Sequence, residues 1–163
     1  MQEIGILFTR YPDPLSSMVR QINRGRFTHV SISIDDSMEK FYSFNFKGFS
    51  EETYEKYMRI GVMDSCLYTL NVSDLVQSYI DYKINKFLEM KEKLQYSKLG
   101  VLLCALHIPL DRENKYFCSE FVAETLQQSK AVEFNRKPQL CFPNHLARIM
   151  DKQECNIEEH FIV

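Results

Sequence analysis

Cys118 is the residue in this chain best suited to covalent chemistry. It lies in the run KYFCSEFV (115–122), where the spacing of Phe121 and Val122 predicts a helix that starts beside the cysteine. The unpaired N–H groups and the dipole at a helix N-terminus stabilise a thiolate, which is the nucleophilic form of cysteine. The backbone N–H of Cys118 is also placed to stabilise an oxyanion. We therefore expect Cys118 to act as a nucleophile.

His29 is the histidine that we expect to act as general base. It opens the run HVSISI (29–34), whose strict alternation predicts a strand with His29, Ser31 and Ser33 on one face. A nucleophilic thiol needs a proton acceptor held on a rigid element. We expect the cysteine helix to pack on this serine-lined face, because small side chains allow close approach. The alternative is that both residues are buried and unreactive.

Three other histidines compete for this role. His107 lies in the loop before Cys118, and His145 follows a proline at a helix start. Both have less rigid surroundings than a strand, and His160 is close to the C-terminus. His29 therefore remains the preferred base.

A zinc site is a further alternative. Cys104 and His107 form a CxxH pair, and Cys141 and His145 form a CxxxH pair. Cys104 lies inside an apolar helical run, however, and neither pair has the context of a zinc finger or ribbon. The chain also has no phosphate-binding glycine loop and no HExxH motif. We expect no resident metal and no cofactor.

Composition favours one folded domain over 1–163. Apolar residues make up 45% of the chain, and the net charge of -2 gives no reason to expect nucleic acid as a partner. No apolar run is long enough to span a bilayer, so we expect no integral membrane segment. Five cysteines without a secretion signal favour free thiols and a cytoplasmic location. The pairs Glu51-Glu52 and Glu158-Glu159 are interpreted as solvated charges.

The order of predicted elements indicates an α+β fold, with helices packed on an antiparallel sheet. Leu15, Met18 and Ile22 have helical spacing in a short early helix. The patterns predict strands at 3–9, 28–35, 40–46, 66–72 and 157–163, and helices at 15–22, 51–58, 74–94, 98–106, 117–129 and 143–150.

The segments FTHVSISID and YFCSEFVAETL resemble the two signature segments of the permuted papain-like cysteine hydrolases. This is the NlpC-type group that includes YiiX-like proteins and relatives of lecithin:retinol acyltransferase. The histidine strand precedes the cysteine helix, as in the permuted members, and the first strand and PNHLARI also fit. The resemblance implies a circularly permuted papain-like fold, with Cys118 as nucleophile and His29 as general base.

The resemblance also implies a third polar residue on the next strand, which would orient the imidazole. Ser43 is the first choice there and Asn45 the second, since both share the more polar face of 40–46. Acyltransferase relatives carry a second histidine at the position of Phe41. The implied reaction is acyl transfer through a thioester on Cys118, with a small-molecule, peptide or acyl substrate and an amidase or peptidase outcome. A degenerate binding module and a thiol acyltransferase acting on lipid are the alternatives.

Overall fold

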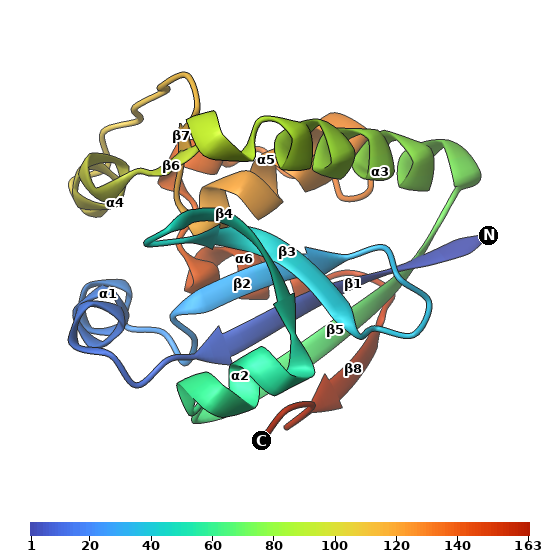
Figure 1. Cartoon of the computed structure of the whole chain (residues 1–163), viewed down its shortest axis with the longest axis horizontal. Coiled ribbons are helices and arrows are strands. Elements are labelled where there is room, and N and C mark those ends of the chain that lie inside the picture. Colours follow the sequence, from blue (N-terminus) through green and yellow to red (C-terminus); the bar gives the residue numbers. More distant parts are fainter.

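A six-stranded antiparallel sheet forms the centre of the protein in the computed structural model, with the strand order β4-β3-β2-β1-β5-β8 (Figure 1). The structure describes the backbone of residues 1–163 and every side chain except those of Leu15, Met18 and Asn23. The proposed spacing of Leu15 and Met18 therefore lies outside the described side chains. The strands of the sheet are β1 (Gln2–Arg10), β2 (His29–Ser33), β3 (Lys40–Asn45), β4 (Gly48–Thr53), β5 (Asp64–Val72) and β8 (Asn156–Glu159).

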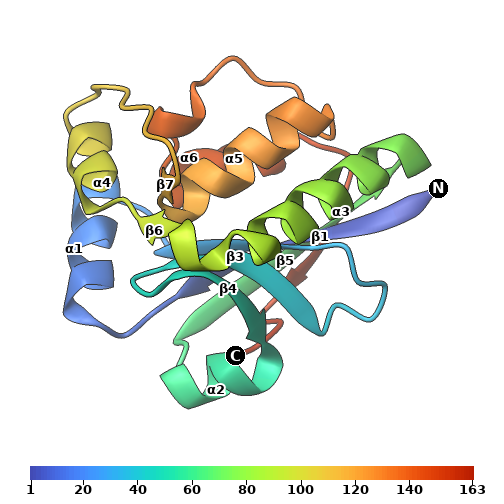
Figure 2. The same cartoon turned by 45° about the horizontal axis from the view of Figure 1, so that its top comes forward.

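Helices cover both faces of this sheet. They are α1 (Pro14–Asn23), α2 (Tyr54–Ile60), α3 (Asp74–Glu89), α4 (Lys98–Ala105), α5 (Cys118–Ser129) and α6 (Pro143–Met150). Two short strands, β6 (Gln95–Tyr96) and β7 (Lys115–Tyr116), pair in parallel, and two 3-10 turns are η1 (Lys91–Lys93) and η2 (Pro138–Leu140). In Figures 1 and 2, α3 and α5 lie over one face, α2 lies on the other, and α1 and α4 lie side by side at one end. The predicted α+β fold with an antiparallel sheet packed by helices is confirmed.

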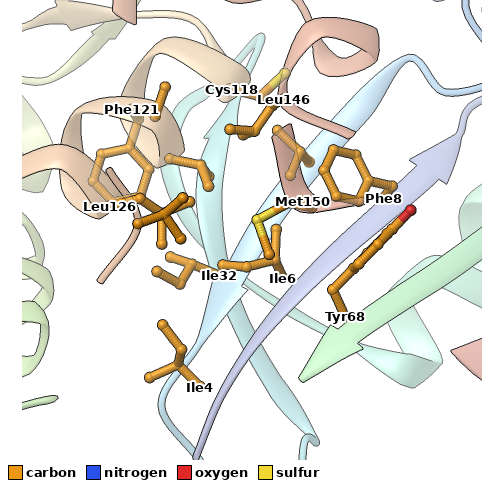
Figure 3. Close-up of a cluster of buried hydrophobic side chains, with 14 of the residues drawn as sticks. Ile4, Ile6, Phe8, Ile32, Tyr68, Cys118, Phe121, Leu126, Leu146 and Met150 are labelled. Atoms are coloured by element: carbon orange, nitrogen blue, oxygen red, sulfur yellow. The ribbon is translucent and has the colours of Figure 1, made fainter. Parts of the chain in front are cut away.

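The alternation of β1 explains why the two faces differ. Ile4, Ile6 and Phe8 point into the larger core, which they share with residues of β2, α3, α5 and α6. Figure 3 shows this cluster between the strands and the overlying helices. Leu7 points the other way, into a smaller core around Tyr57 of α2. Burial of apolar side chains on both faces fixes the register of the strands.

One strand of the six-stranded sheet was missed in the sequence, as were the two-residue strands β6 and β7. The segment 51–58 was expected to be a surface helix, but its first residues belong to β4, and α2 begins only after Thr53. Thr53 caps α2, with its hydroxyl accepting from the N–H of Lys56 at 3.4 Å. Phe49 of β4 faces the larger core and Glu52 the opposite face, which is the alternation of a strand. The strand was missed because Glu51 and Glu52 were both interpreted as solvated charges.

Two other elements are shorter than predicted. The long helix expected over 74–94 ends at Glu89 and is followed by a separate 3-10 turn at 91–93. The last strand was expected over 157–163 and instead covers Asn156–Glu159, pairing with β5. Neither difference changes the position of Cys118 or His29.

The turn between β3 and β4 depends on Gly48. Its φ is +107°, and a Cβ there would lie 2.7 Å from the carbonyl oxygen of Leu94. Gly61 also has a positive φ, +79°, but a Cβ there meets no atom within 4 Å.

We expect Gly61→Ala to lower the free energy of unfolding by about 1–2 kcal/mol through backbone strain. Gly48→Ala should cost roughly 1–3 kcal/mol more, because steric overlap is added. Urea denaturation of both variants measures the difference, and equal losses would contradict the clash.

Candidate active site

Cys118 is the first residue of α5, as the sequence predicted. The residue is only 5% exposed and belongs to the larger core cluster, at one end of which Figure 3 shows it. The helix begins here because the N–H of Phe121 bonds the carbonyl of Phe117 at 3.1 Å. The carboxylate of Glu120 accepts from the N–H of Phe117 at 3.2 Å, and burial raises the pKa of Glu120 to about 8. The thiol is therefore fixed at a helix N-terminus.

His29 lines the same cleft as this thiol. It is the first residue of β2 and is buried, with only 4% of its surface exposed. Interaction with Cys118 raises the pKa of its imidazole, as expected of side chains that lie close together. The ring of Tyr11 stacks on the imidazole, with centroids 4.6 Å apart. Since each residue stands at the first position of its element, thiol and imidazole meet where the strand and the helix both begin.

Glu52 completes the arrangement on the far side of the imidazole. Its two carboxylate oxygens lie 2.9 and 3.1 Å from Nε2 of His29. The hydroxyl of Tyr57 donates to the same carboxylate at 2.7 Å, and Ser31 Oγ lies 2.8 Å from that hydroxyl. Because Nε2 is occupied by Glu52, the imidazole has Nδ1 left for Cys118. The result is a buried series of contacts from the thiol to the imidazole to the carboxylate.

The charges of His29 and Glu52 stabilise one another. Burial alone would lower the pKa of His29, but the Glu52 carboxylate and the hydrogen bonds with Cys118 and Glu52 raise it well above its ordinary value. Burial alone would raise the pKa of Glu52, but the charge of His29 and bonds from His29 and Tyr57 lower it. The carboxylate of Glu52 therefore favours the protonated form of the imidazole.

The third position is a correction to the sequence prediction. The hydroxyl of Ser43 is buried and donates to the carbonyl of Val30 at 2.6 Å, and the amide of Asn45 donates to Ser50 at 2.8 Å. Glu52 contacts the imidazole instead. It was interpreted as a solvated charge, yet it is fully buried, whereas its neighbour Glu51 is exposed. The turn-forming run Asn-Phe-Lys-Gly (45–48), followed by alternation, was the signal for this strand.

The face on which α5 packs is also a correction. The helix was expected over Ser31 and Ser33, but Phe121 and Val122 pack with Val30 and Ile32 on the apolar face. Burial of apolar surface outweighs the closer approach that serines permit. Ser31 faces α2 instead, where its hydroxyl contacts Tyr57. The thiol and the imidazole still meet, because both lie at the ends of their elements.

The competing histidines lie away from this arrangement. Nδ1 of His145 accepts from the N–H of Phe142 at 3.0 Å, and burial and Arg136 lower the pKa of His145 to about 4. His107 is exposed, and His160 lies 3.6 Å from Asp64. No group of three or more His, Cys, Asp or Glu side chains within the described part of the chain is arranged to hold a metal ion.

A cleft of about 820 Å³ opens beside Cys118 and His29. Its walls come from α1, the β3–β4 hairpin, α2, η1 and β6. Apolar and aromatic side chains dominate it: Tyr11, Val19, Phe44, Phe46, Phe49, Ile60 and Tyr96. Four cations also line it: Lys47, Lys56, Arg59 and Lys91. A cleft of this size and lining is typical of a small-molecule site.

Comparison of the sequence with family models and with curated proteins found no match. Among the described helices, none is both long enough and apolar enough to cross a bilayer. All five cysteines are free thiols.

Proposed function

We propose that this protein is a cysteine hydrolase, an amidase or peptidase, that acts by acyl transfer through a thioester on Cys118. One observation carries the proposal: a buried contact series of Cys118, His29 and Glu52 borders a cleft of substrate size. A nucleophile, a base and a group that orients the base form the arrangement used in nucleophilic catalysis. The permuted papain-like fold belongs to the same proposal, since the order of His29 and Cys118 along the chain supports it.

The chemical steps use the residues in this order. The thiolate of Cys118 attacks the substrate carbonyl, and a C–S bond forms as the C–N or C–O bond breaks. The imidazolium of His29 gives its proton to the leaving nitrogen or oxygen. Water then attacks the thioester while His29 takes one of its protons, and the C–S bond breaks to release the acid and the thiolate. Glu52 keeps the imidazole oriented through Nε2 and offsets its charge.

The two alternatives have less support. A degenerate binding module was suggested by the lack of a strong partner for His29, and Glu52 removes that reason. For a lipid acyltransferase, the position of the second histidine is taken by Phe41, which is buried against Tyr57. The hydrolase therefore remains the preferred function.

Selective alkylation tests the proposal. Burial raises the pKa of Cys66, Cys104 and Cys141 to about 12 each, so these thiols should react slowly at neutral pH. We expect iodoacetamide near pH 7 to modify Cys118 first, by at least about tenfold over the other four thiols, and His29→Ala to remove this preference. Peptide mass mapping of the folded protein identifies the modified residue.

The matched control is Cys104→Ser, which removes another buried thiol and should leave the modification of Cys118 unchanged. An acyl-mimicking electrophile should then form a stable adduct at Cys118. Equal labelling of all five thiols, and only after denaturation, would contradict the proposal.

A further inference from the structure

The cleft walls carry two carboxylates and four cations, which differ in the partners that the protein gives them. Of the two carboxylates, Asp13 accepts from the N–H of Ser16 at 2.8 Å, and Glu51 accepts from the hydroxyl of Tyr42 at 3.2 Å. Among the described side chains, none of the four lining cations forms an ion pair. The cleft walls therefore carry four cations and two carboxylates, an excess of positive charge without direct ion pairs.

Lys56 is the best defined of these cations. It is half-buried on α2, and its ammonium donates only to neutral oxygens, those of Ser50 Oγ at 3.3 Å and the Glu51 carbonyl at 3.2 Å. Arg59 lies three residues later and so shares this side of the helix. A cation held by neutral acceptors at the wall of a cleft retains most of its attraction for an anion.

The aromatic wall lies near the thiol. Phe46 and Tyr96 form an edge-to-face pair with centroids 4.9 Å apart, and Phe44 and Phe49 pack at 5.3 Å. Burial and the charge of Cys118 raise the pKa of Tyr96, as expected of a phenol close to this sulfur. Lys56, in contrast, acts on Glu52, whose pKa its charge helps to lower. The aromatic side chains, Lys56 and Arg59 all line the one cleft that Cys118 and His29 border.

We infer that the substrate is an anionic amphiphile: an apolar acyl chain that lies against the aromatic wall, joined through the scissile amide or ester to a group bearing a carboxylate or phosphate that binds Lys56 and Arg59. This inference rests on the proposed function for the bond that is cut, but the binding preference can be measured without catalysis. A neutral or cationic head group would leave the α2 cations without a partner. A short acyl chain would leave Phe46, which is 48% exposed in the protein, without an apolar partner.

Calorimetric titration of the full-length Cys118→Ala variant tests the inference. N-octanoylglycine should bind at least about tenfold more tightly than N-octanoylglycinamide, which has the same chain without the charge. It should bind about 100-fold more tightly than N-acetylglycine, which has the charge without the chain. Added salt should weaken binding of the two anionic ligands and leave that of the neutral amide largely unchanged. Octyl phosphate identifies the head group: tighter binding than N-octanoylglycine assigns a phosphate, and weaker binding assigns a carboxylate.

Variants that remove the two α2 cations, compared with a variant outside the cleft, test which residues bind the carboxylate. Lys56→Gln combined with Arg59→Gln should bring the affinity for N-octanoylglycine down to that for the amide. Lys93→Gln, an exposed lysine outside the cleft, should change neither affinity. Equal affinity for acid and amide in the parent, or an unchanged ratio in the double variant, would overturn the inference. Tight binding together with an unreactive Cys118 would instead count against the hydrolase and leave the binding preference established.

Discussion

Glu52→Gln should lower the alkylation rate of Cys118 at neutral pH by roughly 10- to 100-fold. This is less than the full contribution of a general acid or base, about 100- to 10,000-fold, because His29 itself remains. The glutamine keeps the size of the side chain and one acceptor oxygen for Nε2 of His29, but it removes the negative charge. The imidazolium is then buried without a counter-ion, which disfavours its charged form. Cys118 then lies beside a neutral imidazole, which is a weaker proton donor to the leaving group.

The pH dependence follows from the sign of this effect. The carboxylate of Glu52 raises the pKa of His29, so removing it must lower that pKa. The imidazolium should therefore lose its proton at a lower pH in Glu52→Gln than in the parent protein. Titration of the histidine ring protons by NMR measures this directly, because the chain has only four histidines.

Glu51→Gln is the matched control. It removes the same charge from the adjacent residue, whose exposed side chain points to the opposite face of β4 and contacts Tyr42. We expect its alkylation rate and the titration of His29 to match the parent. Identical behaviour of the two glutamine variants would show that Glu52 has no specific role at the imidazole.

The difference between Glu51 and Glu52 separates the features that could be predicted from sequence from those that could not. Strict alternation over 29–34 and the apolar spacing after Cys118 depend on local periodicity, so both elements could be predicted. The elements that carry His29 and Cys118 therefore need only short-range pattern. The approach of the two side chains was expected from packing of the helix on the serine-lined face, whereas α5 packs on the apolar face.

The partner of His29 could not be obtained in the same way. Whether a glutamate is solvated or buried depends on what faces it, and Glu52 is buried because the imidazole and Tyr57 satisfy its oxygens. Tyr57 comes from the following helix, so the pairing is tertiary. The same limit applies to the face chosen by α5, which is decided by apolar area across the whole sheet rather than by the serines of one strand.

Phe121→Ala should lower the free energy of unfolding by about 3–5 kcal/mol, the range for removing a buried aromatic side chain. The Phe121 ring is fully buried. Its centroid lies 5.5 Å from that of Phe44, 5.3 Å from that of Phe49 and 5.3 Å from that of Phe87. Alanine would leave a cavity that these rings, anchored on two strands and another helix, cannot fill completely. A loss of this size is a large part of the total stability of a domain, which is about 5–15 kcal/mol.

Urea denaturation followed by circular dichroism measures the loss, and two further variants interpret it. Tyr82→Ala removes an aromatic ring that is 63% exposed on α3, and it should change stability by no more than about 0.5 kcal/mol. Phe121→Leu keeps most of the buried volume and should cost less than alanine. A loss below about 1 kcal/mol for Phe121→Ala would mean that the aromatic cluster does not hold α5 on the sheet.

The same substitution links stability to the candidate site. Phe121 lies one helical turn after Cys118, and its neighbours Phe44 and Phe49 line the cleft. If this ring positions the start of α5, the folded Phe121→Leu variant should keep the selective alkylation of Cys118. Phe121→Ala should lose that selectivity at urea concentrations where the parent protein retains it. We therefore expect the thiol to react selectively only while the aromatic cluster holds the N-terminus of α5 against the end of β2.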